Sequence, residues 1–161
     1  GSTSTPFMGS LDGNGYSISG LTINQSSQNV LGLFGVTTAA TIKKLELKNV
    51  NVVGSSDVAG LVGKSIGTNI SEVYVSGIIN GNDHVGAIAG GTFAGGTTLI
   101  TNCYSDAQVS TRSSQVGGLL GVAASATVSN SYFSGTVILD DGTKLTIDKL
   151  IGFAEKVKNR W

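Results

Sequence analysis

The chain has 161 residues, of which 24 are glycine, about twice the usual share for a globular protein. Ten basic residues balance ten acidic residues, so net charge gives no general reason to bind nucleic acid or an anionic membrane surface. Apolar residues make up 40% of the chain, which argues against disorder, and no apolar run is long enough to insert into a membrane as a helix.

The chain divides into three predicted segments. Residues 1–5 start with Gly-Ser and are expected to be a linker or a remnant of processing, which indicates a piece of a longer protein. Residues 6–147 are predicted to form one repeat domain, because no helical apolar period interrupts them. Residues 148–161 hold four of the ten basic residues and are predicted to be a C-terminal cap or a linker, with a helical turn at 153–157.

Within the repeat domain, a four-residue phrase of the type Gly-Leu-Xaa-Gly recurs. Its closing glycines are 28, 27 and 31 residues apart. The copies are Gly32-Leu33-Phe34-Gly35, Gly60-Leu61-Val62-Gly63, Ala87-Ile88-Ala89-Gly90 and Gly118-Leu119-Leu120-Gly121. Leu150-Ile151-Gly152 is interpreted as a degenerate fifth copy, which would form a last half-coil. A fixed period of this length is typical of repeat architectures.

A second phrase, with alternating apolar and polar residues, falls between the copies. It opens at Ile42, Ile70, Ile100 and Val128, so it keeps nearly the same period. Alternation with β-branched residues predicts half-buried strands. The residues on the predicted inner parity are Leu45, Leu47, Val73, Val75, Cys103, Ser105, Ala107, Val109, Phe133 and Val137.

Together the two phrases predict an all-β fold: a parallel β-solenoid of about five coils, with repeats of 27–31 residues. Glycine is expected at the coil corners, where the backbone needs either a positive φ or a close approach to another chain segment. Each tetrapeptide is interpreted as a short inward strand with a turn on each side. Gly63 and Gly121 are therefore expected to lie at such corners.

These phrases resemble the GLUG-repeat family, which is named for the tetrapeptide. The resemblance covers roughly residues 6 to 140. The matching segments are Val58–Gly63, Val85–Gly90, Val116–Gly121, Ile100–Tyr104, Val128–Gly135 and a lead-in at Phe7–Ile23. The resemblance implies a bacterial cell-surface or secreted, adhesin-like repeat protein. GLUG repeats also accompany some immunoglobulin-cleaving metallopeptidases, but this chain has the single histidine His84 and no His-Glu-x-x-His pattern.

Tyr74, Tyr104 and Tyr132 hold equivalent places in successive predicted coils and are the candidate ligand-binding residues. Stacked coils would align them as an outer row, which could contact a glycan or a protein. The alternative is a structural ladder in which the rings cover one another. No cofactor is expected, and the expected partners are a glycan or protein ligand and neighbouring domains of a longer chain.

Catalytic and metal-binding functions have little support in the sequence. The carboxylates Asp57, Glu72, Asp83 and Asp106 are scattered, and His84 beside Asp83 is interpreted as a surface pair at a turn. The acidic turns at 12–15 and 140–142 lack the spacing of known calcium loops, and Asp-Gly is an ordinary turn dipeptide. We therefore expect a non-enzymatic extracellular module, with a mechanical spacer as the first alternative and a polysaccharide-active enzyme as a distant one.

Overall fold

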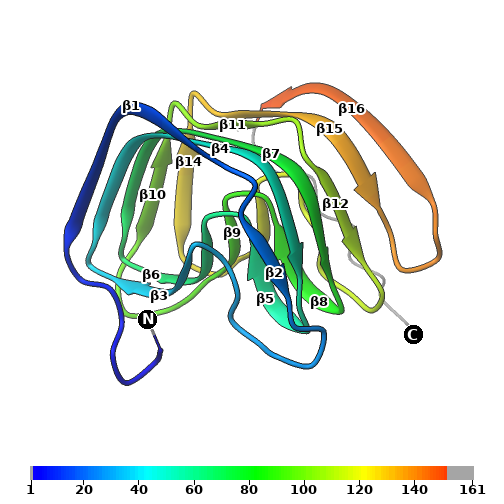
Figure 1. Cartoon of the computed structure of the whole chain (residues 1–161), viewed down its shortest axis with the longest axis horizontal. Helices are drawn as coiled ribbons and strands as arrows, with labels where there is room; N and C mark the ends of the chain where they lie inside the picture. Colours follow the sequence, from blue (N-terminus) through cyan, green and yellow to red (C-terminus); the bar gives the residue numbers. More distant parts are fainter. Residues whose placement is uncertain (1, 152–161) are drawn as a thin grey trace.

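The computed structural model describes residues 2–151, and every regular element in that range is a β-strand (Figure 1). The strands wind into a β-solenoid of about five turns, which confirms the predicted fold class. Strand β1 (Ser10–Ser19) lies at one end of the solenoid and β16 (Lys144–Ile151) at the other. None of the described residues belongs to a helix long and apolar enough to span a bilayer.

The largest sheet has ten strands and forms the broad side of the solenoid. Its main path runs β1–β4–β7–β11–β15–β12, and the other four strands pair beside this path. Besides β1 and β16, its members are β2 (Thr22–Asn24), β4 (Thr41–Val53), β7 (Asn69–Gly81), β10 (Thr98–Thr101), β11 (Tyr104–Ser105), β12 (Gln108–Thr111), β14 (Ala126–Ser129) and β15 (Tyr132–Ile138).

Two smaller sheets complete the coils. One has four parallel strands, β3 (Phe34–Thr38), β6 (Val62–Ile66), β9 (Ala89–Thr92) and β13 (Leu120–Ala123). The other pairs β5 (Ser56–Ala59) with β8 (Asp83–Gly86). In each coil the chain passes from the four-stranded sheet into the ten-stranded sheet, and then through the two-stranded sheet or its equivalent.

The predicted alternation along the long strands is confirmed. All ten residues of the predicted inner parity are at most 3% exposed and form part of the hydrophobic core or its polar lining. Equivalent residues stack between coils, as in the inner file Leu47–Val75–Ser105–Phe133. A small residue, Ser105, therefore lies directly beneath the large Phe133 ring, which lets a narrow interior accept both.

The tetrapeptides are piled in register, as the repeat period predicted. Backbone hydrogen bonds run from Phe34 N to Leu61 O (2.8 Å), from Val62 N to Ile88 O (3.0 Å), and from Ile88 N to Leu119 O (2.9 Å). Each strand of the four-stranded sheet starts at the third residue of its tetrapeptide and continues beyond it. Leu61, Ile88 and Leu119 are fully buried, so the inward orientation of the phrase is confirmed.

The expectation that Gly63 and Gly121 lie at coil corners is wrong, because both lie inside strands, Gly63 in β6 and Gly121 in β13. Neither glycine is among the positive-φ glycines, and most coil corners use non-glycine residues in the left-handed region. One corner file consists of Asn14, Lys44, Glu72, Asn102 and Asn130, with φ between 48° and 54°. A second corner file consists of Val30, Asp57, His84 and Gln115, with φ between 23° and 63°.

The closing glycines are required instead by close approach, the other alternative given for glycine. A Cβ on Gly63 would lie 2.7 Å from Val30 C, and a Cβ on Gly121 would lie 2.5 Å from His84 C. Gly63 and Gly121 thus each pack against a left-handed corner of another coil. Glycine is therefore needed at these strand positions because a side chain there would collide with the left-handed corner residue of the stacked coil.

A buried ladder of hydroxyl groups was not anticipated from the sequence. Thr68 Oγ1 donates to Thr37 Oγ1 at 2.8 Å, and Ser65 Oγ and Thr98 Oγ1 share a hydrogen bond of 2.9 Å. All four residues are fully buried. The hydroxyls satisfy one another across coils, so the ladder links the four-stranded sheet to the start of the ten-stranded sheet without an unpaired polar group.

The interpretation of Leu150-Ile151-Gly152 as a fifth tetrapeptide is wrong for the two described residues. Leu150 and Ile151 pair with Phe133 and Tyr132, because β16 runs antiparallel to β15. The reversal occurs at Asp140-Asp141-Gly142, where Gly142 has φ 81° and donates to Leu139 O. The helical turn expected at 153–157 lies outside the described residues.

Candidate functional site

The three candidate tyrosines lie in one file on the outer face of the ten-stranded sheet. Tyr74 of β7 is in register with Tyr104 of β11, which is in register with Tyr132 of β15. Glu46 of β4 occupies the same place in the preceding coil. We call Glu46, Tyr74, Tyr104 and Tyr132 the ring file. Its alignment follows from the strand register, because parallel coils place equivalent residues above one another.

The rings of the file stack on one another. The ring centroids of Tyr74 and Tyr104 are 4.5 Å apart, and those of Tyr104 and Tyr132 are 5.4 Å apart with an interplanar angle of 15°. Both faces of the Tyr104 ring are therefore covered by neighbouring rings, although the side chain is 37% exposed. The ring file presents ring edges and hydroxyl groups to the outside, so stacking of a sugar on the face of Tyr104 is blocked.

Burial and nearby carboxylates raise the pKa values of two tyrosines in the ring file. Tyr74 Oη donates to Asp106 Oδ1 at 2.8 Å. Burial raises the pKa of Tyr74, and the hydrogen bond to Asp106 raises it further. The pKa of Tyr104 is raised as well, first by burial and then by the nearby charge of Glu46. The hydroxyls of Tyr74 and Tyr104 are consequently neutral donors throughout the physiological pH range, and the carboxylates beside them are acceptors.

A hollow adjoins the ring file at its Glu46 end. Its lining includes Asn14, Lys44, Glu46 and Glu72, and its volume is about 340 Å³. Glu72, one of the scattered carboxylates, therefore belongs to the surroundings of the ring file. Asp106 joins it through the hydrogen bond to Tyr74. The hollow and the ring edges together offer acidic, basic and amide groups on one face.

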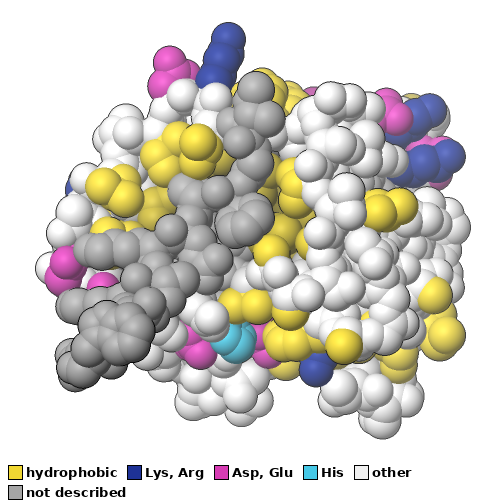
Figure 2. Space-filling view, turned by 180° about the vertical axis from the view of Figure 1, so that it is seen from behind, with side chains coloured by type: hydrophobic (Ala, Val, Ile, Leu, Met, Phe, Trp, Pro, Cys, Tyr) yellow, Lys and Arg dark blue, Asp and Glu magenta, His cyan; other side chains and the backbone are white. Residues whose placement is uncertain are grey.

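The other two scattered carboxylates converge on the histidine. His84 Nδ1 lies 2.8 Å from Asp57 Oδ1, and His84 Nε2 lies 3.4 Å from Asp83 Oδ2. Figure 2 shows the histidine side chain between acidic side chains on the back of the molecule. Ser114 Oγ donates to the other oxygen of Asp83 at 2.6 Å. The serine hydroxyl is thus engaged by a carboxylate, which is not the arrangement of a serine nucleophile activated by a histidine.

The pairing of His84 with Asp57 was missed at the sequence level, although a signal was present. The two residues are 27 apart, the same spacing as Gly63 and Gly90. Residues one coil apart are stacked, so the period predicts their contact. The prediction of a surface pair formed by His84 and Asp83 alone is incomplete, because the histidine also bridges to the coil below.

The acidic turns at 12–15 and 140–142 do not bring together a set of metal-binding side chains within the described residues. Asp12 Oδ1 accepts the backbone N–H of Asn14 at 2.9 Å, and this hydrogen bond is the main reason that the pKa of Asp12 is lowered. Asp12 Oδ2 lies 3.3 Å from Lys43 Nζ. Residues 2–151 contain no group of three or more acidic, histidine or cysteine side chains placed to hold a metal ion.

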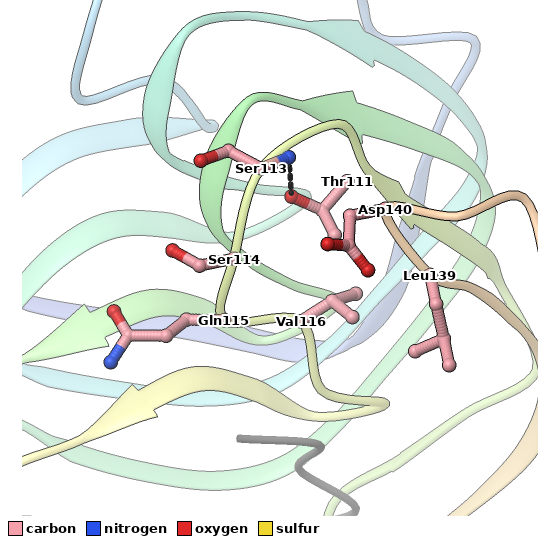
Figure 3. A pocket seen from close by; sticks show the side chains of 7 residues that line it. All are labelled: Thr111, Ser113, Ser114, Gln115, Val116, Leu139 and Asp140. Carbon is pink, nitrogen blue, oxygen red and sulfur yellow. Dashed lines mark hydrogen bonds between the residues drawn. The ribbon is translucent and has the colours of Figure 1, made fainter. Parts of the chain in front are cut away.

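A small cavity of about 30 Å³ lies where the hairpin leaves the last coil (Figure 3). It is lined by Thr111, Leu139, Asp140 and residues 113–116. Ser113 N donates to Thr111 Oγ1, so part of its polar lining is already satisfied. The space admits one or two water molecules and no organic ligand.

Cys103 lies on the inner parity and is buried. Its thiol donates to the carbonyl of Thr101 at 3.4 Å and approaches that of Ile70 at 3.7 Å. Burial raises the pKa of this thiol to about 11 from an ordinary value of 9.0. The thiol is therefore protonated and shielded in the folded chain, which is the opposite of a reactive cysteine.

We expect Cys103 to resist iodoacetamide in the folded protein at about pH 8 and to react quickly in urea.

The same pKa shift predicts how stability depends on pH. Because the pKa of the Cys103 thiol is higher in the folded state, the unfolded state loses this proton first as the pH rises. The contribution of the thiol to the free energy of unfolding is therefore complete below pH 9.0 and falls as the pH rises toward about 11. Urea unfolding of the parent and of Cys103→Ala across this range should show a steeper decline in the parent, and equal slopes would contradict the assignment.

The sequence of this chain is similar to segments of several much longer proteins. A protein family described as "Domain of unknown function (DUF2804)" matches residues 121–161. Halomucin of Haloquadratum walsbyi is 41% identical over 150 residues, a match that covers 78% of this chain and 2% of halomucin. The immunoglobulin A1 protease of Streptococcus pneumoniae is 32% identical over 130 residues, covering 74% of this chain and 6% of the protease.

One more sequence relative and one solved structure also carry the name immunoglobulin A1 protease. The immunoglobulin A1 protease of Streptococcus sanguinis is 30% identical over 159 residues, covering 92% of this chain and 8% of the protease. A crystal structure from Bacteroides ovatus, described as that of a "putative immunoglobulin A1 protease", has a TM-score of 0.64 and 20% identity to this chain. That match covers 81% of this chain and 44% of the crystallised one, and it supports the fold.

Proposed function

We propose that this chain is a non-enzymatic, extracellular repeat module of a larger surface protein, and that it binds a glycan or a protein through the ring file. The names of the matched proteins, halomucin and immunoglobulin A1 protease, support a surface location. The chain spans only 2% to 8% of these relatives, so their own activities reside in far longer polypeptides. The GLUG-repeat resemblance is part of this proposal.

The observation that carries the proposed function is the ordered outer edge of the ring file. Tyr104 is held by stacking on both sides and still reaches solvent. A preorganised tyrosine edge loses little side-chain entropy on binding and offers both an apolar edge and a hydroxyl. With Glu46 and Asp106 beside it, the file suits a partner rich in hydroxyl or amide donors.

Catalysis is the weaker interpretation of the polar side chains of this chain. The nitrogens of His84 lie near two carboxylates, and Ser114 donates to one of them, so these residues link coils. Glu72 lines the hollow beside Glu46, and Asp106 accepts the hydrogen bond from Tyr74. A polysaccharide-active enzyme would release reducing ends from a glycan panel, and we expect none to be released.

A mechanical spacer is the second candidate, and one observation favours it. The covered ring faces stiffen the sheet by cross-strand contact, which is the role of a structural ladder. A spacer would need the stacking and would not need the exposed edges. The two candidates therefore differ in what happens when an exposed ring is removed from a chain that still folds.

We expect the parent chain to bind members of a glycan and host-protein array, and Tyr104→Ser to weaken that binding at least about tenfold. The serine should be tolerated, because the same file position holds Glu46 in another coil. Ile78→Ser is the matched control, since Ile78 is exposed on the same sheet outside the file. Two results would favour the spacer. One is no binding by the parent, and the other is unchanged binding by folded Tyr104→Ser and by a folded variant with alanine at Tyr74, Tyr104 and Tyr132.

A further inference from the structure

The ring file brings three tyrosines into direct contact along the axis of the solenoid. Tyr74 and Tyr104 are 30 residues apart in the sequence, but their ring centroids are only 4.5 Å apart. The ring centroids of Tyr104 and Tyr132 are 5.4 Å apart. The contacts follow from the strand ladder, which holds neighbouring coils at about 4.8 Å. The backbone therefore keeps each ring beside the next one.

The edges of these rings are the parts that take part in phenol oxidation. A phenol that loses one electron and its proton carries the unpaired electron on its oxygen and on ring carbons that include the two ortho to it. The ring file presents its hydroxyl groups and ring edges to solvent, and Tyr104 is 37% exposed. An oxidant can thus reach Tyr104 in the folded chain, with the half-buried ring of Tyr74 stacked against it.

A hydrogen bond prepares Tyr74 to lose its proton together with an electron. Burial raises the pKa of Tyr74, so its hydroxyl keeps the proton at neutral pH, and removal of an electron then requires an acceptor for that proton. Tyr74 Oη donates to Asp106 Oδ1 at 2.8 Å. The carboxylate can take the proton as the ring is oxidised, so this phenol is easier to oxidise than one without an acceptor.

A disulfide cannot link the coils of this chain to one another. The sequence contains a single cysteine, Cys103, and its thiol is buried. A covalent bond between Tyr74 and Tyr104 would close a loop of one coil. A closed loop restricts the unfolded chain more than the folded one, so such a bond would stabilise the two coils that it joins.

We propose that Tyr74 and Tyr104 form an oxidative cross-linking site, at which hydrogen peroxide and a haem peroxidase join the two rings by a carbon–carbon bond. Each phenol loses one electron and its hydroxyl proton, and the peroxide takes up both electrons and both protons to become two water molecules. The two radicals then form a bond between carbons ortho to the oxygens. The hydrogen on each of these carbons leaves as a proton and each oxygen regains one, so both phenols are restored. The inference does not depend on the proposed ligand binding.

Oxidation of the intact, folded chain with a haem peroxidase and hydrogen peroxide tests the proposal, in dilute solution so that links between chains are disfavoured. We expect a product with the mass of one chain less two hydrogen atoms and with the blue fluorescence of a bityrosine. Cleavage beside aspartate separates the two tyrosines at Asp83, so their peptides should remain joined only by the new bond. The cross-linked chain should unfold at a higher urea concentration than the untreated chain.

Phenylalanine variants keep the rings and remove the hydroxyls that the oxidation requires. Tyr74→Phe and Tyr104→Phe should lose the product and still fold, as far-ultraviolet circular dichroism would verify. Tyr16→Phe is the matched control, because Tyr16 is 73% exposed on β1 outside the ring file, and this variant should react like the parent. Tyr132→Phe should also keep the product, because the contact between Tyr74 and Tyr104 does not involve this hydroxyl.

Three results would overturn the cross-linking site. The first is a parent chain that forms no bond within the chain, or forms bonds only between chains. The second is a bond within the chain that survives Tyr74→Phe, or whose joined peptides contain Tyr132 in place of Tyr74. The third is a product that Tyr16→Phe abolishes. A cross-linked chain that unfolds at the same urea concentration as the untreated chain would overturn the stabilising role.

Discussion

Gly121→Val is expected to lower the free energy of unfolding by about 3–5 kcal/mol, enough to unfold much of the chain at 37 °C. A Cβ at this position would lie 2.5 Å from both Gly90 O and His84 C. These are backbone atoms of stacked coils, which cannot move aside without breaking the parallel ladder. Valine also has two γ carbons, so no rotamer relieves the clash.

Gly20→Ala separates this packing effect from backbone strain. Gly20 has φ 74°, but a Cβ built there meets nothing within 4 Å. Its substitution should cost only about 1–2 kcal/mol, the usual penalty for a left-handed non-glycine residue. Urea unfolding followed by circular dichroism gives both values. If Gly121→Val lost no more stability than Gly20→Ala, close approach would not be the reason for the closing glycines.

The periodic features of this fold can be predicted from sequence because each coil repeats one local pattern. Alternation identifies the inner parity of Leu47 and Val75, and the spacing of phrases identifies which residues stack. The same spacing placed Tyr74, Tyr104 and Tyr132 in one file. It did not determine how the rings meet, because ring orientation depends on side-chain rotamers and on neighbours such as Asp106.

The corners could not be predicted, since they depend on contacts between coils. A glycine signals either a positive φ or a close approach, and the sequence does not distinguish the two. Gly63 is close to Val30, 33 residues earlier, and the left-handed conformation falls on Val30 itself. A β-branched residue is an unexpected choice for that conformation. The stacked coil, including Gly63, holds it there.

The end of the repeat was misinterpreted for a different reason. Leu150-Ile151 matches the apolar part of the tetrapeptide, but an Asp-Gly turn stands before it. Thr143 N donates to Asp141 Oδ1 at 2.9 Å, which fixes the reversal and sends β16 back along β15. A turn with a side-chain acceptor outweighs a weak repeat match, because local hydrogen bonds select the hairpin directly.

Phe133→Ala is expected to cost about 3–5 kcal/mol, because it empties the largest fully buried side chain of the last parallel coil. The ring packs under Gly118, where a Cβ would lie 2.5 Å from Phe133 Cδ1, and over Ser105 of the coil below. Ser105 is too small to fill the space left by the ring. The cavity would therefore persist, and its cost would add to the lost transfer free energy.

The adjacent residue supplies the control for this prediction. Tyr132 points outward from the same strand, so Tyr132→Ala should cost only about 1 kcal/mol. Phe133→Val should lie between the two, and adding Ser105→Val to it should recover part of the loss by restoring the summed volume of the stacked pair. Thermal and urea unfolding of these variants would show the order. Equal losses for Phe133→Ala and Tyr132→Ala would contradict a core whose stability depends on matching large residues to small ones between coils.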